Sequence, residues 1–399
     1  MKLDAALIGI IMMPFTYGFI GWLTNVVALK MTFYPLNFWG IPPYLGWQGI
    51  VPRKSKALAL KSVNMITERL IKLDEFFSKV DPDQLEAEFQ PVLSDKIPSI
   101  TDRIIEALPE DIRSQLSGDH REKILKRAEH ESGHTVKHIA TQMRDNISSI
   151  FNFKNFVLKS LTGPNVKRIV DIFQEVGSHE FKFIEKSGLF FGAILGTGQA
   201  VLWHFFPIWY TLPIQGVIVG YITNWLALVM IFRPLYEKRF LFFKYHGLFL
   251  KRQDEVSQKY CRMFGNDILT PRNLMEEILY RRASRTVYDS VVKSISEEMH
   301  EMHLEGDTNL ESIDDIKKDI INEAINDMSK ASAKLEKYMG RALNVERNMY
   351  SRMSKLPPEE FEPILRSAFQ EDEYILILIG AVLGAFVGLG QAIYMLTIG

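Results

Sequence analysis

The amino-acid sequence predicts an all-α protein with four transmembrane helices in two pseudo-symmetric repeats, each carrying an inserted amphipathic helical cytoplasmic region. Two observations predict this fold. The 399 residues include 47 basic and 48 acidic side chains, yet three stretches of 25, 46 and 26 residues hold no charged residue: 5–29, 187–232 and 374–399. In addition, a motif that closes the first stretch recurs at the end of the second. The average composition is typical of a soluble protein. It is, however, the average of an uncharged part and a highly charged part of the chain.

The length of each uncharged stretch sets the number of helices. About 20 apolar residues cross the hydrocarbon core as one helix, because only intrahelical hydrogen bonds satisfy the backbone there. The first and last stretches fit one helix each, and the middle stretch fits two, with Pro207 and Pro213 marking the break. The predicted spans are 5–29, 188–206, 213–232 and 375–397. All six tryptophans lie in or beside them, as expected for interfacial anchors.

The charged regions between the spans have apolar residues at three- and four-residue spacing, which predicts amphipathic helices in a bundle or an antiparallel stalk. Their apolar faces pack in a core or hold lipid. Strand-like alternation is almost absent, and the echo of Phe361-Glu-Pro-Ile-Leu at Phe89-Gln-Pro-Val-Leu indicates that the two regions are not collinear. The predicted parts are a first membrane helix (1–36), a helical region (37–187), a membrane hairpin (188–235), a second helical region (236–373) and a last membrane helix (374–399).

The distribution of basic residues predicts the orientation. Lys and Arg gather beside the ends of the spans that face the two charged regions, and the short turn at 207–213 holds none. By the positive-inside rule, both charged regions are cytoplasmic and both termini lie outside. The expected location is the inner, or plasma, membrane of a bacterium.

An internal repeat accounts for the motif. Nine residues from Gly21 to Leu36 recur 199 positions later, from Gly220 to Leu235, and include Thr24-Asn25 and Thr223-Asn224. The second and fourth spans also match, at an offset of 192. Glycines four residues apart line one face of each span and predict close helix packing: Gly188, Gly192 and Gly196, and Gly380, Gly384 and Gly388.

Six polar side chains are predicted to form a layer inside the membrane bundle. Gln199 and Gln391 follow the glycines by about one turn, and their buried amides need partners. We expect the two Thr-Asn pairs to supply them. The layer then either holds the helices together or lines a pathway for a small solute.

The Gly-x-x-Thr-Asn-x-x-Ala motif, the closing Phe361-Glu-Pro-Ile-Leu and the Gly-rich helix with its glutamine resemble the YheB-like membrane proteins, catalogued as domain of unknown function 445. The resemblance implies a bacterial envelope membrane protein with helical extramembrane parts. It implies no reaction and no residue roles.

Two aromatic segments that end in basic residues come after the Thr-Asn helices, one from Tyr34 and one from Pro234. Such segments favour the membrane interface, with rings at headgroup depth and cations on anionic lipid. The predicted headgroup contacts are Arg53, Lys54, Lys251 and Arg252. Membrane phospholipid is therefore the expected ligand, and a protein partner or a second copy of the chain is the alternative. The net charge of −1 argues against nucleic acid.

One pattern suggests an enzyme. His130-Glu131-Ser-Gly-His134 is a His-Glu-x-x-His sequence, which on a helix places two imidazoles on one face for zinc. Its flanks are polar, and Gly133 weakens the helix. Elsewhere no cofactor motif occurs, so no cofactor is expected. The leading hypothesis is a non-enzymatic membrane protein that handles lipid or organises the membrane; the alternatives are a zinc metalloprotease and a small-solute transporter.

Overall fold

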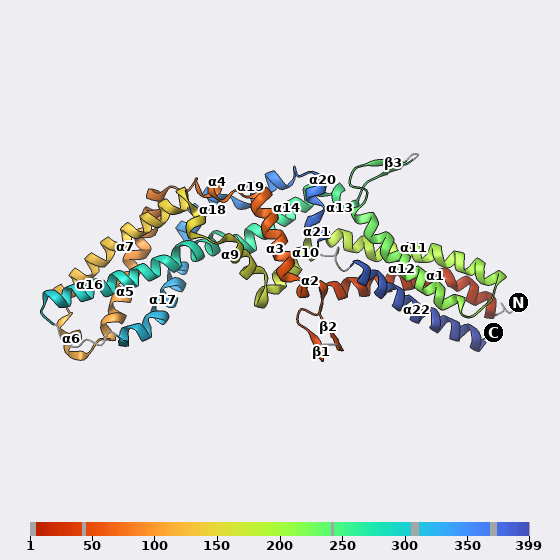
Figure 1. Cartoon of the computed structure of the whole chain (residues 1–399), viewed down its shortest axis with the longest axis horizontal. Coiled ribbons are helices and arrows are strands. Elements are labelled where there is room, and N and C mark those ends of the chain that lie inside the picture. Colours follow the sequence, from red (N-terminus) through yellow and green to blue (C-terminus); the bar gives the residue numbers. More distant parts are fainter. Residues whose placement is uncertain (1–4, 42–44, 241–242, 305–310, 368–372, 399) are drawn as a thin grey trace. The chain divides into compact units, whose positions relative to one another are not determined.

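The computed structural model describes residues 5–41, 45–240, 243–304, 311–367 and 373–398. They are almost entirely helical, apart from two short antiparallel hairpins (Figure 1). The chain divides into two compact units. We call them the membrane unit (1–65, 157–261 and 350–399) and the second unit (66–156 and 262–349). Each predicted extramembrane region, 37–187 and 236–373, is divided between the two.

Four helices of the membrane unit are long and apolar enough to cross a membrane, which confirms the predicted number of spans. They are α1 (Ala5–Phe33), α11 (Ser178–Phe205), α12 (Thr211–Phe232) and α22 (Glu373–Ile398). Pro207 lies in the break between α11 and α12, as predicted, whereas Pro213 is the third residue of α12. Figure 1 shows the four helices side by side, α1 packing mainly on α11 and α12 mainly on α22. Large apolar side chains such as Phe15, Phe190 and Phe386 point outward, as lipid contact requires.

Each Thr-Asn helix is followed by the same series of elements. After α1 come β1 (Trp39–Ile41), β2 (Leu45–Trp47), α2 (Ile50–Arg53), α3 (Ser55–Met65), the π-helical η1 (Ile66–Leu70) and α4 (Leu73–Phe77). After α12 come β3 (Lys238–Phe240), β4 (Phe243–Tyr245), α13 (Leu248–Lys251), α14 (Gln253–Met263), η3 (Phe264–Ile268) and α15 (Pro271–Met275). From α2 onward each counterpart begins 198 residues later. The expectation that the two regions are not collinear is therefore wrong for these segments, and the strands were not predicted.

The second unit is a bundle with α5 (Pro82–Glu106), α7 (Asp119–Asp145), α16 (Arg281–Glu301) and α17 (Glu311–Ala331) at its centre. The ring of Phe89 stacks on that of Tyr280 at 6.0 Å between centroids, and both side chains are fully buried. The Asp81 carboxylate caps α5 by accepting from the amides of Asp83 and Gln84. This unit also contains α6 (Glu110–Gln115), α8 (Ile147–Ile150), η4 (Glu276–Tyr280) and α18 (Ala333–Leu343). The membrane unit also contains η2 (Gly163–Asn165), α10 (Val166–Val176), α20 (Pro358–Phe361) and α21 (Pro363–Arg366), and the boundary between the units falls within α9 (Phe153–Leu161) and α19 (Val345–Met353).

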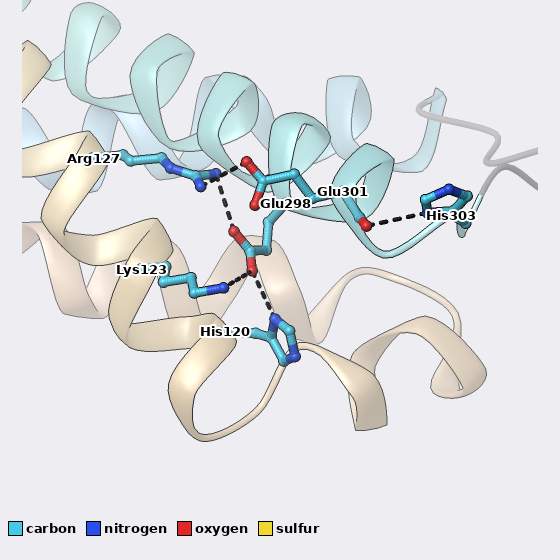
Figure 2. A network of polar contacts seen from close by, with 6 residues as sticks. All are labelled: His120, Lys123, Arg127, Glu298, Glu301 and His303. Atoms are coloured by element: carbon cyan, nitrogen blue, oxygen red, sulfur yellow. Dashed lines mark hydrogen bonds and ion pairs between the residues drawn. The ribbon is translucent and has the colours of Figure 1, made fainter.

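A buried carboxylate joins α7 to α16 in the second unit (Figure 2). The Glu298 side chain is fully buried, and its oxygens lie 2.6 Å from His120 Nδ1, 3.4 Å from Lys123 Nζ and 3.0 Å from an Arg127 guanidinium nitrogen. Arg127 also pairs with Glu301 at 2.9 Å. A carboxylate taken out of water is stable only when it is paired in this way.

The surroundings of Glu298 lower the pKa of its carboxyl. Burial alone would raise that pKa, but the hydrogen bonds from His120 and Lys123 and the charges of Lys123 and Arg127 outweigh burial. A carboxyl whose pKa is lowered by folding adds stability above its unfolded pKa, and this stability is lost as the pH falls through the folded value. The network therefore supports the second unit at neutral pH and fails in acid.

We predict that Glu298→Gln destabilises the second unit by roughly 1–3 kcal/mol at pH 7, because Gln cannot neutralise the three basic partners. The difference should shrink as the pH falls below the usual range of a glutamate carboxyl and through the lowered pKa of Glu298, where the wild-type carboxyl also becomes protonated. The measurement is denaturant unfolding followed by circular dichroism at pH 7 and at progressively lower pH. Glu297→Gln is the matched control, because the Glu297 side chain is about half exposed. Equal stability of the Glu298 variant and wild type at pH 7 would contradict the assignment.

Candidate functional site

Two buried asparagines join the membrane helices in pairs. Asn25 of α1 donates from Nδ2 to the backbone oxygen of Ile184 in α11, at 2.5 Å. Asn224 of α12 donates in the same way to Leu376 in α22, at 2.8 Å. Both side chains are at least nine-tenths buried. A backbone carbonyl of a neighbouring helix is thus the partner of each amide.

Glycines make these hydrogen bonds possible. A Cβ added at Gly188 would lie 2.6 Å from Asn25 Nδ2 and 2.2 Å from the backbone oxygen of Gly21. A Cβ at Gly380 would lie 2.4 Å from Asn224 Nδ2 and 2.6 Å from the oxygen of Gly220. Any side chain at 188 or 380 would occupy the path of the asparagine amide. The Thr-Asn motif of one helix and the first glycine of its neighbour therefore form one structural element.

The other predicted glycines continue each helix contact away from the asparagine. An added Cβ would lie 2.3 Å from the oxygen of Tyr17 at Gly192, and 2.0 Å from that of Gly216 at Gly384. At the far end, Gly196 lies against Met13 and Tyr17, and Gly388 lies against Leu212. In both pairs the backbones touch along the glycine face, the small-xxx-small mode of membrane helices.

The remaining polar residues do not meet the asparagines. Thr24 and Thr223 donate to backbone oxygens of their own helices. Gln199 lies 3.5 Å from the Thr211 hydroxyl, so the expected pairing of the glutamines with the Thr-Asn motifs is wrong. A fully buried apolar layer lies between asparagines and glutamines; it consists of Met13, Tyr17, Ile20, Leu212 and Val219. The polar residues therefore form two layers separated by an apolar one.

The predicted headgroup contacts differ in their surroundings. Arg53 and Lys251 are exposed, and the guanidinium carbon of Arg53 lies 6.0 Å from the centre of the Trp47 ring. Lys54 is half-buried. Arg252 donates to the buried Glu180 carboxylate at 2.6 Å and also pairs with Glu255. Glu180 thus holds Arg252 against the protein. It lies 72 residues earlier in the chain, so no local sequence pattern could reveal this ion pair.

The two hairpins are fastened to the ends of the Thr-Asn helices. Trp47 Nε1 donates to the backbone oxygen of Met31, and Gln48 Nε2 donates to that of Leu36. In the second hairpin, His246 Nε2 contacts the oxygen of Leu235 at 3.0 Å. The Gly49 and Gly247 amides donate to the oxygens of Pro35 and Pro234, both at 3.0 Å. Each hairpin is therefore held beside the end of the membrane helix that precedes it.

The exposed side chains of the hairpins are of two kinds. In β1–β2, three large apolar side chains are mostly exposed: Trp39 at 78%, Ile41 at 71% and Leu45 at 73%. In β3–β4, Lys238, Arg239 and Lys244 are exposed, and Lys244 pairs with Glu237. The sequence predicted aromatic and basic residues at the interface here. It did not predict that the strands would hold the apolar side chains away from the protein.

The His-Glu-x-x-His motif lies on α7, and its two imidazoles are neighbours with ring centroids 4.7 Å apart. Glu131 points to α16, where its carboxylate accepts from Lys293 Nζ at 2.6 Å. Within the described ranges, no group of three or more His, Cys, Asp or Glu side chains could hold a metal ion. The donor set therefore does not fit a zinc site: two histidines have no third ligand, and the carboxylate that would act as base is neutralised by a lysine.

Residues 214–371 match the model of a family described as "Protein of unknown function (DUF445)". The match confirms the resemblance to domain of unknown function 445 over less than half of the chain, and it includes Thr223-Asn224. A search of curated proteins found no match to the sequence.

The glycine contacts generate a prediction with an internal control. Gly384→Ala should destabilise the protein by roughly 1–3 kcal/mol, because the new Cβ would meet the backbone of Gly216 and the helices would have to separate. Gly390→Ala, in the same helix, should be neutral or slightly stabilising, because a Cβ there meets nothing within 4 Å and alanine favours helix. Thermal unfolding in detergent measures the stability of both variants. A similar loss of stability in the two variants would refute close packing at Gly384.

Proposed function

We propose that this chain is a non-enzymatic integral protein of the bacterial inner membrane that binds phospholipid at the cytoplasmic membrane surface and organises the membrane there. The exposed apolar hairpin β1–β2, fastened to the end of α1, is the observation that carries the proposal. Trp, Ile and Leu side chains on a hairpin beside the end of a membrane helix are stabilised when they enter the membrane–water interface. In water they would form an unfavourable apolar patch.

The arrangement of the two halves supports the proposal. The chain between α1 and α12 contains one further membrane helix, α11, so α1 and α12 cross the membrane in the same direction. Both hairpins then emerge on one face, and the basic residues that gather there support our proposal that this face is cytoplasmic. We infer two copies of one unit related by a pseudo-two-fold axis along the membrane normal. One copy carries an apolar hairpin and the other a basic one, so together they bind acyl chains and anionic headgroups.

A groove between α12 and α22 offers a further lipid contact. Its volume is about 400 Å³ and its lining is apolar, including Val217, Ala381, Ala385 and Phe386. It lies on membrane-spanning helices, so we propose that an acyl chain fills it. Two pockets of the second unit have polar linings with charged side chains such as Glu129 and Arg272, which suit a protein partner better than lipid.

The alternatives have less support. A transport pathway would have to pass the layer of Tyr17, Ile20 and Val219, whose side chains are fully buried in contact with one another. Proteolysis would need a zinc ligand set that His130, Glu131 and His134 do not complete.

The depth of the apolar hairpin tests the proposal. With Cys261→Ser as background, a nitroxide on Leu45→Cys in native-lipid nanodiscs should be relaxed more by oxygen than by a water-soluble nickel chelate. Lys126→Cys is the control and should show the opposite, because the Lys126 side chain is 74% exposed on α7. Nickel accessibility at 45 equal to that at 126 would place the hairpin in water.

Lipid retention tests the same proposal chemically. The purified protein should carry phospholipid in mass spectrometry, and the double variant Lys238→Glu and Arg239→Glu should carry less anionic lipid, because reversed charges repel the headgroups. Lys126→Glu is a charge-reversal control outside the hairpins. Lipid-free wild-type protein would overturn the proposal.

A further inference from the structure

The two asparagines of the membrane unit leave two oxygens unused. Each amide must turn its nitrogen toward the carbonyl of Ile184 or Leu376, because a carbonyl accepts only from a donor. The orientation of each Oδ1 is thereby fixed. Asn25 Oδ1 and Asn224 Oδ1 are buried and have no hydrogen-bond partner among the described residues. An unpaired amide oxygen in an apolar environment is destabilising, so a missing donor is implied.

One small cavity adjoins both asparagines. Its volume is about 20 Å³, and it lies where all four membrane helices meet. The lining residues are Asn25, Ala28, Leu29 and Thr32 of α1, Ile184 of α11, Asn224 and Leu228 of α12, and Leu376 of α22. A cavity of this size accommodates a single water molecule.

The lining defines the chemistry of the occupant. Thr32 donates its hydroxyl hydrogen to the oxygen of Ala28, and the polar atoms of the lining that are buried without a partner are the acceptors Asn25 Oδ1 and Asn224 Oδ1. The occupant must therefore donate hydrogen bonds. No charged side chain lines the cavity, and two amide oxygens are too few to replace the hydration shell of a cation.

We propose that a water molecule occupies this cavity and donates one hydrogen bond to Asn25 Oδ1 and the other to Asn224 Oδ1. Its two hydrogens match the two unused acceptors. The α1–α11 pair and the α12–α22 pair are each closed by direct contact through glycine, whereas this water bridges the two pairs. This inference is independent of the lipid-binding function that we propose.

A double-mutant cycle in the full-length protein tests the bridge. Asn25→Ala and Asn224→Ala each remove one direct hydrogen bond and one end of the bridge. The double variant should therefore be destabilised by less than the sum, with a coupling of at least about fivefold in the unfolding equilibrium constant. Asn25→Ala with Gln391→Ala is the control and should be additive, because Gln391 belongs to the other polar layer. Additive effects in the asparagine pair would overturn the proposal.

A second measurement needs no variant. A density map of the wild-type protein in nanodiscs, at a resolution that reveals ordered water, should contain one peak within hydrogen-bond distance of both Oδ1 atoms. Unfolding midpoints in sodium, potassium and ammonium chloride at equal ionic strength should agree. An empty cavity, or stabilisation by one of these cations alone, would overturn the water assignment.

Discussion

The membrane unit depends on an asparagine amide that reaches across a glycine to a backbone carbonyl of the next helix. The bond from Asn25 to Ile184 forms only if α1 and α11 approach until the backbones touch at Gly21 and Gly188. The bond from Asn224 to Leu376 imposes the same approach on α12 and α22. In lipid there is no hydrophobic force between helices, so packing and such hydrogen bonds must supply the association. Large side chains such as Phe15, Phe190 and Phe386 are accordingly directed outward.

The fixed helix pairs position the juxtamembrane segments of the chain. Phe33, the last residue of α1, packs on Phe181 of α11, and Phe232 of α12 packs on Phe249, which stacks on Phe361. Aromatic contacts thus join α1 to α11, and α12 through α13 to α20. The hydrogen bond from Trp47 to Met31 then holds the apolar hairpin beside the end of α1. The lipid-binding role that we propose rests on this continuous connection from the asparagine to the hairpin.

Local composition and spacing were sufficient to predict the spans and the glycine faces, because an uncharged helix and a four-residue glycine spacing are properties of consecutive residues. The partners of Asn25 and Asn224 could not be predicted, because they are backbone oxygens and leave no trace in side-chain pattern. The three-residue strands were missed because they are too short for alternation to be visible. The pairing of Arg252 with Glu180, and the burial of Glu298 on a highly charged helix, depend on tertiary contacts between distant segments.

Cysteine cross-linking in native membranes tests the helix pairing most directly. A Cβ at Gly18 would lie 3.3 Å from Ala193 Cβ, close to the separation that a disulfide requires. In the Cys261→Ser background, the account predicts that Gly18→Cys and Ala193→Cys form a disulfide on mild oxidation. Gly18→Cys with Gly198→Cys should not, because a Cβ at 198 has no neighbour within 4 Å. Failure of the first pair to cross-link, or equal cross-linking of both, would contradict the glycine-mediated contact.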